Sequence, residues 1–229
     1  MSNKKTIGFD ADDTLWENEV FFHQAQMKFI DLHPQIKNPE EVILQIEKEN
    51  IKFYGYGIKG FILSLLEASV RYSNNQPDFQ NIDKIIKTGK YMLAQPIQLL
   101  PEVEETLRHL SEHYMLIMIT KGDLLDQQRK VERSGLLKYF SSTDIVSEKD
   151  EQTYLEILEK YNISPRDFIM VGNSLKSDVL PVRKIGGTGI YIPHKFTWKH
   201  EKVKSTFDLE RVVELKTISA LKVWLKDQI

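Results

Sequence analysis

The sequence contains no cysteine, and this absence removes several kinds of chemistry at once. Disulfide bonds, thiolate nucleophiles and zinc sites with cysteine ligands are all excluded, and the composition fits a reducing compartment. Long apolar runs are missing too, since none approaches the roughly 18 residues that a membrane-spanning helix needs. The opening MSNKKTIGFD is basic but lacks the apolar stretch of a secretory signal, so we expect a soluble cytoplasmic protein.

A surplus of charge of either sign is also missing. The 31 lysines and arginines nearly balance the 33 aspartates and glutamates, which gives a formal net charge of −2. We therefore expect neither nucleic acid nor a membrane surface as a partner, while the oligomeric state stays open. A small anionic substrate remains compatible, because one metal ion and one lysine can bind a phosphate locally. The 229 residues, 41% of them hydrophobic, suffice for one or two domains with a buried core.

Five short apolar runs, rich in β-branched residues, predict the strands of a sheet. None of them alternates cleanly between polar and apolar residues, which is typical of strands buried on both faces in a parallel sheet. Between the later runs, apolar stripes predict helices at 101–110, opened by Pro101, and at Leu124–Ser134, 154–161 and 179–185, with Gly135 ending the second. This alternation favours a doubly wound, Rossmann-like α/β fold. The predicted strands are 6–9, 115–119, 144–146, 168–171 and 189–192.

The long stretch between the first strand and Pro101 has no strand pattern. Apolar residues recur there at spacings of three and four, in stripes within 22–32, 58–69 and 82–93. A further helix is expected to start at Asn38-Pro39-Glu40-Glu41, with Asn38 as the N-cap and acidic residues in the first turn. These patterns predict a bundle of helices inserted between the first two strands.

The insertion divides the chain into two expected domains. The α/β core takes residues 1–15 and 98–229, and the helical cap takes residues 16–97. The loops near 16–18 and 95–101 would then be the hinges.

Three carboxylates lie within four positions directly after the first predicted strand, in Phe9-Asp10-Ala11-Asp12-Asp13-Thr14-Leu15. In a doubly wound sheet, ligands bind beyond the carboxyl ends of the strands. Clustered carboxylates repel one another unless a cation offsets their charge, and oxygen ligands suit Mg²⁺. A solvated acidic turn is the alternative, and the position at a strand end favours a metal site.

This segment resembles the first motif of the haloacid dehalogenase superfamily, D-x-D-x-T after a hydrophobic strand. The resemblance implies that Asp10 is the nucleophile, forming an aspartyl-phosphate, and that Asp12 is the general acid and base. It also implies that Mg²⁺ is bound by the Asp10 carboxylate and the backbone carbonyl of Asp12. Thr14 would brace the loop, whereas Asp13 stands where many relatives carry glycine and has no assigned role.

Later segments resemble the other motifs of the superfamily, in the expected order. Thr120 ends the second strand and would hydrogen-bond the phosphoryl group, with Lys121 and Gly122 adding backbone N–H donors. Lys149 follows the third strand and would contact both nucleophile and phosphate, although Asp150 replaces the usual proline after it. The alternatives are a threonine that caps the next helix and an ordinary surface lysine.

The fourth motif lies in 171–179 and resembles G-D-x-x-x-x-D. The resemblance implies that Asn173 and Asp178 complete the metal site. Asn173 stands where an acid is common, and its uncharged amide oxygen predicts weaker binding of Mg²⁺ rather than none. A helix start capped by Asn173 or Ser174 is the alternative, and the two interpretations are compatible.

Within the inserted bundle, glycines alternate with aromatic residues in 53–60. Closure of a cap over the phosphate would exclude water and complete the site. We hypothesise that Tyr54, Tyr56 and Lys59 form a specificity loop that faces Asp10. A connection between helices with packing tyrosines is the alternative.

Together, the motifs predict a Mg²⁺-dependent phosphatase that hydrolyses a small phosphorylated metabolite. Alternatives within the superfamily are a phosphonate hydrolase, a phosphomutase and a dehalogenase, although a dehalogenase would need no acid at Asp12. A catalytically weak phosphate-binding regulatory protein is the alternative of another class. His194 and Trp198 are further candidates for the pocket rim, with surface placement as their alternative.

Overall fold

The computed structural model describes residues 5–73, 76, 78–196 and 212–227. Within them, six strands form one parallel sheet in the order β3-β2-β1-β4-β5-β6. All five predicted strands are confirmed, with ends that shift by up to two residues, and the two-residue β6 is an addition. The bounds are β1 Thr6–Phe9, β2 Met115–Lys121, β3 Ser142–Val146, β4 Phe168–Gly172, β5 Thr188–Tyr191 and β6 Val213–Glu214.

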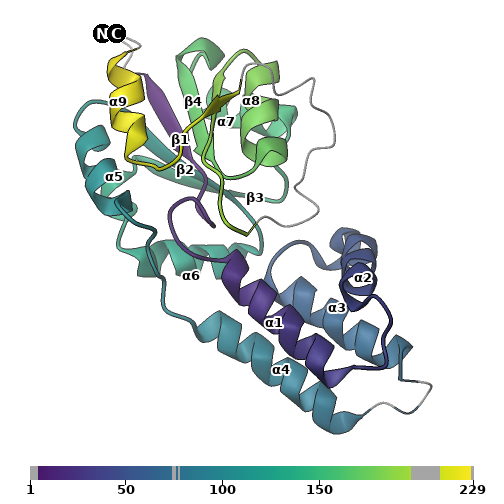
Figure 1. Ribbon diagram of the computed structural model, residues 1–229. Helices are drawn as coiled ribbons and strands as arrows, with labels where there is room; N and C mark the ends of the chain where they lie inside the picture. The colour runs from purple at the N-terminus through teal and green to yellow at the C-terminus, as the bar shows by residue number, and fades with distance from the viewer. Residues whose placement is uncertain (1–4, 74–75, 77, 197–211, 228–229) are drawn as a thin grey trace.

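The sheet is covered on both faces, as the continuous apolar runs predict. Alternate residues of one strand point to opposite faces: Leu116 and Met118 join one buried cluster, whereas Ile117 and Ile119 join another. Helices α5, α6 and α9 pack on the first face, and α7 and α8 pack on the second (Figure 1). The doubly wound α/β fold is therefore confirmed. These helices are α5 Val103–Ser111, α6 Leu124–Ser134, α7 Glu151–Lys160, α8 Leu180–Lys184 and α9 Ala220–Lys226.

The chain reverses its direction across the sheet at β1, which lies between β2 and β4. From β1 the connections lead first to β2 and β3, and then back across the sheet to β4 and β5. Crevices open at such a switch point, beyond the carboxyl ends of the strands. The residues that follow β1, β2 and β4 therefore meet at one edge of the sheet.

Four helices follow β1 and pack around a hydrophobic cluster of their own, beyond the end of the sheet at which β1 ends (Figure 1). Ala25, Phe29, Phe61, Leu65 and Ile85 are buried in this cluster, on the faces that the stripes predict. The helices are α1 Glu19–Leu32, α2 Pro39–Tyr54, α3 Ile58–Arg71 and α4 Phe79–Ala94.

Two details of these helices differ from the expectation. Asn38 precedes α2, but its side chain makes no capping hydrogen bond, because its backbone lies in the left-handed region with φ 49°. Ile86 belongs to the predicted stripe of α4, yet its side chain is exposed, since the buried stripe runs through Ile85, Gly89 and Met92.

The two segments that connect the bundle to the sheet run side by side. Trp16 and Leu99 form an antiparallel bridge, the N–H of Glu17 donates to the carbonyl of Gln98, and the N–H of Leu100 donates to that of Leu15. Trp16 is fully buried. The entry to the bundle and the exit from it are therefore tied together by backbone hydrogen bonds.

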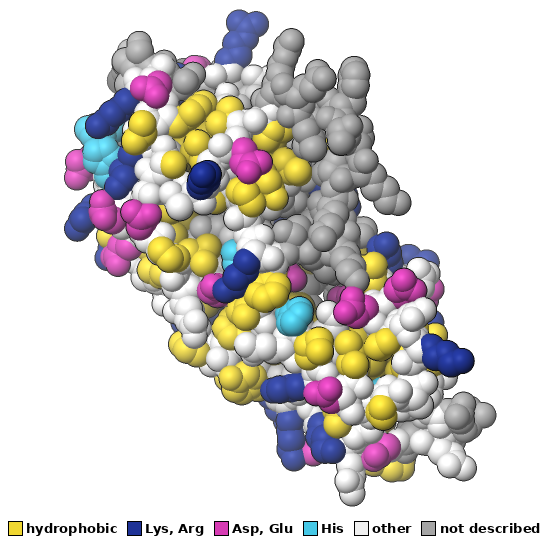
Figure 2. Space-filling model, in the orientation of Figure 1, with side chains coloured by type: hydrophobic (Ala, Val, Ile, Leu, Met, Phe, Trp, Pro, Cys, Tyr) yellow, Lys and Arg dark blue, Asp and Glu magenta, His cyan; other side chains and the backbone are white. Residues whose placement is uncertain are grey.

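The surface carries no broad area of one charge sign on the face drawn in Figure 2, where acidic and basic side chains are interspersed. Within the described part of the chain, every helix is too short or too polar to cross a lipid bilayer.

We predict that Gly8→Ala destabilises the protein by about 1–3 kcal/mol, because extra atoms in a packed core force strain on their neighbours. A Cβ atom at Gly8 would lie 2.6 Å from Cζ of Phe168, whose side chain is fully buried. Thermal unfolding measures the loss. Ser141→Ala at an exposed position is the control, and an unchanged Tm of Gly8→Ala would contradict the prediction.

Candidate functional site

A cavity of about 420 Å³ lies between the carboxyl ends of the strands and the helical bundle. The residues that sequence motifs single out after β1 to β4 come from four separate segments, and nearly all of them line it. Gly122 does not line the cavity. The lining residues from this group are Asp10, Asp12, Thr120, Lys121, Lys149, Asn173 and Asp178.

Asp10 follows β1 and is 7% exposed. Its two carboxylate oxygens have different partners. The hydroxyl of Thr14 donates to Oδ2 at 2.8 Å, and the ammonium of Lys149 donates to Oδ1 at 2.5 Å. The N–H of Asn173 donates to the Thr14 hydroxyl at 3.1 Å, so Thr14 links the loops after β1 and β4. Asp10 is thus fixed in direction by two side chains.

Lys149 is buried between two carboxylates. Its ammonium lies 2.5 Å from Asp10 Oδ1 and 2.7 Å from Asp178 Oδ1, and both Lys149 and Asp178 are almost fully buried. Burial alone would lower the pKa of Lys149, but the charges of Asp10 and Asp178 outweigh it and raise that pKa above its usual value. Burial raises the pKa of Asp178 to about 7, with Asp10 adding to the shift and Lys149 opposing it. The three charges therefore depend on one another.

The loop after β4 brings Asp178 this close through a π-helical turn, Leu175–Val179. The Ser174 hydroxyl accepts from the N–H of Ser177, and the Ser174 N–H donates to Asp178 Oδ2 at 2.9 Å. Gly172 leaves the necessary space, because a Cβ atom there would lie 2.2 Å from that same oxygen. Both oxygens of Asp178 are thus bonded to protein donors, and its role as a metal ligand stays a prediction.

Three groups with oxygen atoms converge where the motifs predict Mg²⁺. If the amide of Asn173 turns its nitrogen inward, that nitrogen lies 3.1 Å from Asp10 Oδ2 and 3.3 Å from the backbone carbonyl of Asp12. If it turns its oxygen inward, three oxygens face one another, which is favourable only around a cation. Carboxylate, carbonyl and amide oxygens are the ligands of Mg²⁺. The residues therefore fit this ion.

The side chain of Asp12 lines the same cavity and accepts hydrogen bonds from three residues. Lys130 donates to its oxygens at 3.0 and 2.9 Å, Gln127 donates at 2.7 Å, and the Trp16 indole donates at 2.7 Å. Lys130 also donates to the side chain of Asn18 at 2.9 Å, just before α1. Lys130 and Gln127 were not expected from the sequence, because α6 carries no motif that marks them.

Asp13 has a structural role that the sequence does not reveal. Its backbone has φ 61°, and its buried carboxylate accepts the N–H groups of Asn18 and Glu19, which begin α1. Burial, with the negative charge of Asp12, raises its pKa to about 8. The His194 side chain is largely buried 3.4 Å from Asp13, so the surface alternative is wrong, and His194 does not line the cavity either. Trp198 lies outside the described residues.

Thr120 is 1% exposed and lines the cavity, and its hydroxyl has no hydrogen-bond partner among the described residues. A buried hydroxyl without a partner is costly, so a ligand that supplies an acceptor would relieve this cost. The neighbouring Lys121 is held by Glu148 at 3.2 Å and by the Ser177 hydroxyl at 3.0 Å.

The segment between α2 and α3 touches the core, but only Tyr56 of its three predicted residues lines the cavity. The Tyr56 hydroxyl donates to Glu148 at 2.6 Å, and the Lys121 ammonium lies 4.4 Å from the centroid of its ring. Lys59 forms an ion pair with Asp123 at 2.8 Å, and Tyr54 is exposed. The structure thus brings Tyr56 to the cavity, whereas Lys59 and its partner Asp123 are not among the residues that line it.

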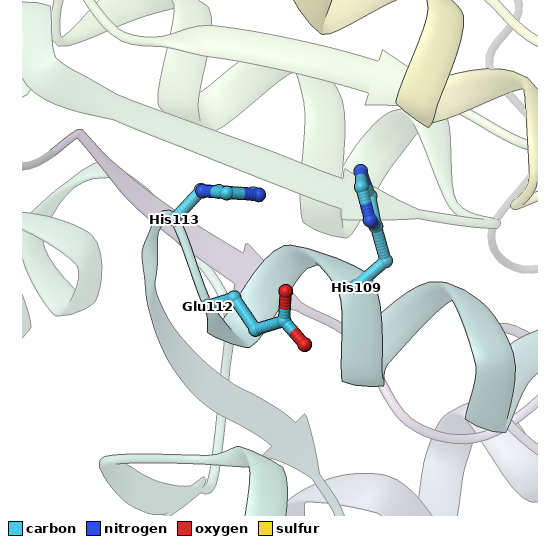
Figure 3. Close-up of side chains that lie close together, drawn as sticks. All are labelled: His109, Glu112 and His113. Carbon is cyan, nitrogen blue, oxygen red and sulfur yellow. The ribbon is translucent and has the colours of Figure 1, made fainter.

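A second group of possible metal ligands lies on the surface at the end of α5, outside the cavity lining (Figure 3). His109, Glu112 and His113 each offer one ligand atom, and these atoms lie within 4.8 Å of one another. Imidazole nitrogens suit transition metals rather than Mg²⁺. Titrations of this protein with Mn²⁺, Co²⁺ or Zn²⁺ therefore need a His113→Ala control.

We predict that Lys149→Met lowers the free energy of unfolding by about 3–5 kcal/mol at pH 8 without divalent cations, because it leaves two buried carboxylates uncompensated. The folded-state pKa of Asp178, already raised to about 7, would rise further. An acid whose pKa is raised by folding costs no stability at low pH, where it is protonated in both states. The cost grows as pH rises from the unfolded-state pKa to the folded-state pKa. The loss of stability in Lys149→Met should therefore be smaller at pH 5.

Urea unfolding at pH 5 and pH 8 in EDTA measures the effect of Lys149→Met. The double variant with Asp178→Asn should recover part of the stability at pH 8. An equal loss at both pH values would contradict the electrostatic explanation.

Comparisons with known proteins agree with this geometry. A family described as haloacid dehalogenase-like hydrolase matches residues 4–186. N-acylneuraminate-9-phosphatase of Rattus norvegicus is 22% identical over 193 residues, which are 78% of this chain and 78% of that protein. Glyceraldehyde 3-phosphate phosphatase of Pyrococcus furiosus is 30% identical over 201 residues, which are 81% of this chain and 79% of that protein.

A crystal structure of a haloacid dehalogenase-like family hydrolase from Xanthomonas campestris has a TM-score of 0.87 to this chain. The two sequences are 32% identical, and the match covers 99% of this chain and 93% of the other. The family match spans the first strand and the loops after β1 to β4, which hold the cavity residues. The chain therefore belongs to the haloacid dehalogenase-like hydrolase family.

Proposed function

We propose that this hydrolase is a Mg²⁺-dependent phosphatase that hydrolyses a small phosphorylated metabolite through an aspartyl-phosphate on Asp10. The observation that carries the proposal is the convergence of Asp10, Asp12, Thr120, Lys149 and Asn173, from four segments of the chain, on one cavity. The family and its phosphatase relatives make the chain a phosphoric monoester hydrolase.

In the proposed reaction, Asp10 attacks phosphorus, and the leaving alkoxide takes a proton from Asp12. Asp12 then accepts a proton from the water that hydrolyses the acyl phosphate, which returns Asp10 as a carboxylate and releases phosphate. Lys149 orients Asp10 and offsets negative charge at the phosphoryl group, and Thr120 donates its hydroxyl to a phosphoryl oxygen. For these steps the Asp12 side chain must give up some of its bonds to Lys130 and Gln127.

The Asp10 carboxylate, the Asp12 carbonyl and the Asn173 amide oxygen would hold Mg²⁺, which supplies positive charge next to the phosphoryl oxygens when bound. Asp178 would contribute by holding Lys149, and it could become a ligand only by giving up one of its present bonds. Because Asn173 is uncharged, we expect a weaker affinity for Mg²⁺ than a carboxylate at this position would give.

The helical bundle, residues 16–97, would act as the cap that closes over the phosphate, with hinges near 16–18 and 95–101. Its contact with the core through Tyr56 and Glu148 supports a closed arrangement. Of the substrates named for the two relatives, glyceraldehyde 3-phosphate, whose leaving group is uncharged, is the first candidate for this chain. The absence of cysteine fits a cytoplasmic location, which stays a prediction.

Other functions are less well supported. A dehalogenase would not need the proton-transferring Asp12 or the convergence of oxygens at Asn173. A regulatory phosphate-binding protein would not need a nucleophile and an acid–base group in one cavity. No feature of the described residues favours a phosphonate hydrolase or a phosphomutase.

We predict that the protein hydrolyses p-nitrophenyl phosphate with Mg²⁺ and loses this activity in EDTA. Asp10→Asn should abolish turnover, because an amide is a poor nucleophile, and Asp12→Asn should lower kcat by about 10²–10⁴-fold. Steady-state release of p-nitrophenol measures both.

Asp83→Asn, on the exposed face of α4, is the matched control and should keep full activity. Activity that survives EDTA, or that persists in Asp10→Asn, would overturn the proposed function.

A further inference from the structure

We propose that the bundle side of the cavity selects phosphate esters whose leaving group is rich in hydroxyl groups or carries an amine, and disfavours leaving groups with a carboxylate or a second phosphate. This inference rests on the proposed phosphatase function. It adds the chemical class of the substrate, which the motifs around Asp10 do not determine.

The two sides of the cavity differ in charge. The core side carries three lysines, Lys121, Lys130 and Lys149, whereas the described bundle residues that line the cavity include no lysine or arginine. The bundle side carries three glutamates instead, Glu19, Glu40 and Glu47. The phosphate end of a substrate therefore meets cations, and its other end meets carboxyl groups.

The core lysines are already engaged by acidic groups of the protein. Lys149 lies between Asp10 and Asp178, Lys130 pairs with Asp12 at 2.9 Å, and Lys121 pairs with Glu148 at 3.2 Å. A second negative group on the substrate would have to compete with these carboxylates for a cation. Among the described residues, the cavity therefore lacks a lysine or arginine reserved for a carboxylate on the leaving group.

Glu19 is at the first position of α1, next to the carboxylate of Asp13. Burial raises the pKa of Glu19 to about 8, and the charges of Asp13 and Glu47 add to this shift. The same surroundings, buried and close to other carboxylates, would also disfavour a negative charge on a ligand. An ammonium group or a hydroxyl donor at the same place would be stabilised.

The rest of the bundle side suits hydroxyl groups. Asn50 and Ser64 are buried cavity-lining residues joined by a hydrogen bond of 3.2 Å. The rings of Phe22 and Phe61, 5.1 Å apart, provide apolar surface beside them. A mixture of uncharged polar groups and aromatic faces matches a polyol or a sugar. The unpartnered hydroxyl of Thr120 in the same cavity is an independent sign that a ligand is accommodated here.

The test compares three phosphates of similar size whose phosphate ends are alike: glucose 6-phosphate, glucosamine 6-phosphate and 6-phosphogluconate. Each is assayed as a substrate and as a competitive inhibitor of p-nitrophenyl phosphate hydrolysis, so that binding is measured even without turnover. We expect 6-phosphogluconate to be at least about tenfold poorer than the other two in kcat/KM or in inhibition constant.

The double variant Glu19→Gln, Glu47→Gln should remove most of the preference against 6-phosphogluconate. Glutamine keeps the size of the side chain and its ability to form hydrogen bonds. Glu41→Gln, an exposed position of α2 outside the cavity lining, should leave the preference unchanged. Circular dichroism and Tm check that each variant is folded. If the double variant is unfolded, the two single variants are compared in the same way.

The two proposals fail differently. Loss of all p-nitrophenyl phosphate hydrolysis in the unmodified protein would overturn the proposed function. With that hydrolysis intact, equal handling of 6-phosphogluconate, an unchanged preference in the glutamine variants, or no inhibition by any of the three phosphates would overturn the inference about the leaving group.

Discussion

The buried ammonium of Lys149 between the carboxylates of Asp10 and Asp178 is the constraint on which the rest of the site depends. The three groups come from the ends of β1, β3 and β4, and none of them is stable in its buried position without the others. Their mutual dependence holds three strand ends in one arrangement. The Thr14 hydroxyl and the turn around Ser174 then fix the directions of the two carboxylates. Pairing of buried charges thus sets the geometry in which Asp10 faces the cavity.

The layered fold could be predicted from the sequence because its signals are local. Strands buried on both faces appear as uninterrupted apolar runs, and Gly135 marks the end of α6 with φ 70°, as expected for a helix C-terminus. The two-residue β6 is too short to leave a periodic pattern. The left-handed backbone at Asn38 was missed because an asparagine before proline is equally typical of a capped helix start. Short elements and single dihedral angles depend on tertiary contacts that local patterns do not contain.

The residues of the candidate site also fall into those that local sequence signals reveal and those that depend on tertiary contacts. Residues that directly follow a strand were found, since parallel strands bring their carboxyl ends to one edge. The sequence does not reveal Lys130 and Gln127, because they reach Asp12 from within α6 and nothing in their spacing marks them. In the segment before α3, glycines and aromatic residues indicated a special loop, but not which side chain turns inward. Tyr56 turns inward because Glu148 accepts a hydrogen bond from its hydroxyl and Lys121 contacts its ring. Lys59 instead forms an ion pair with Asp123.

The turn after β1 joins the chemistry to the bundle within a few residues. Asp10 and Asp12 face the cavity, and the next residue, Asp13, holds the backbone of Asn18 and Glu19 at the start of α1. Lys130 connects the side chains of Asp12 and Asn18 from α6. A movement of α1 against the sheet must therefore break bonds to Asp13 and Lys130 or begin beyond Glu19. Lys130 also binds Asp12, the proposed acid–base group. A displacement of α1 and a reorientation of the Asp12 side chain would therefore both break contacts made by Lys130.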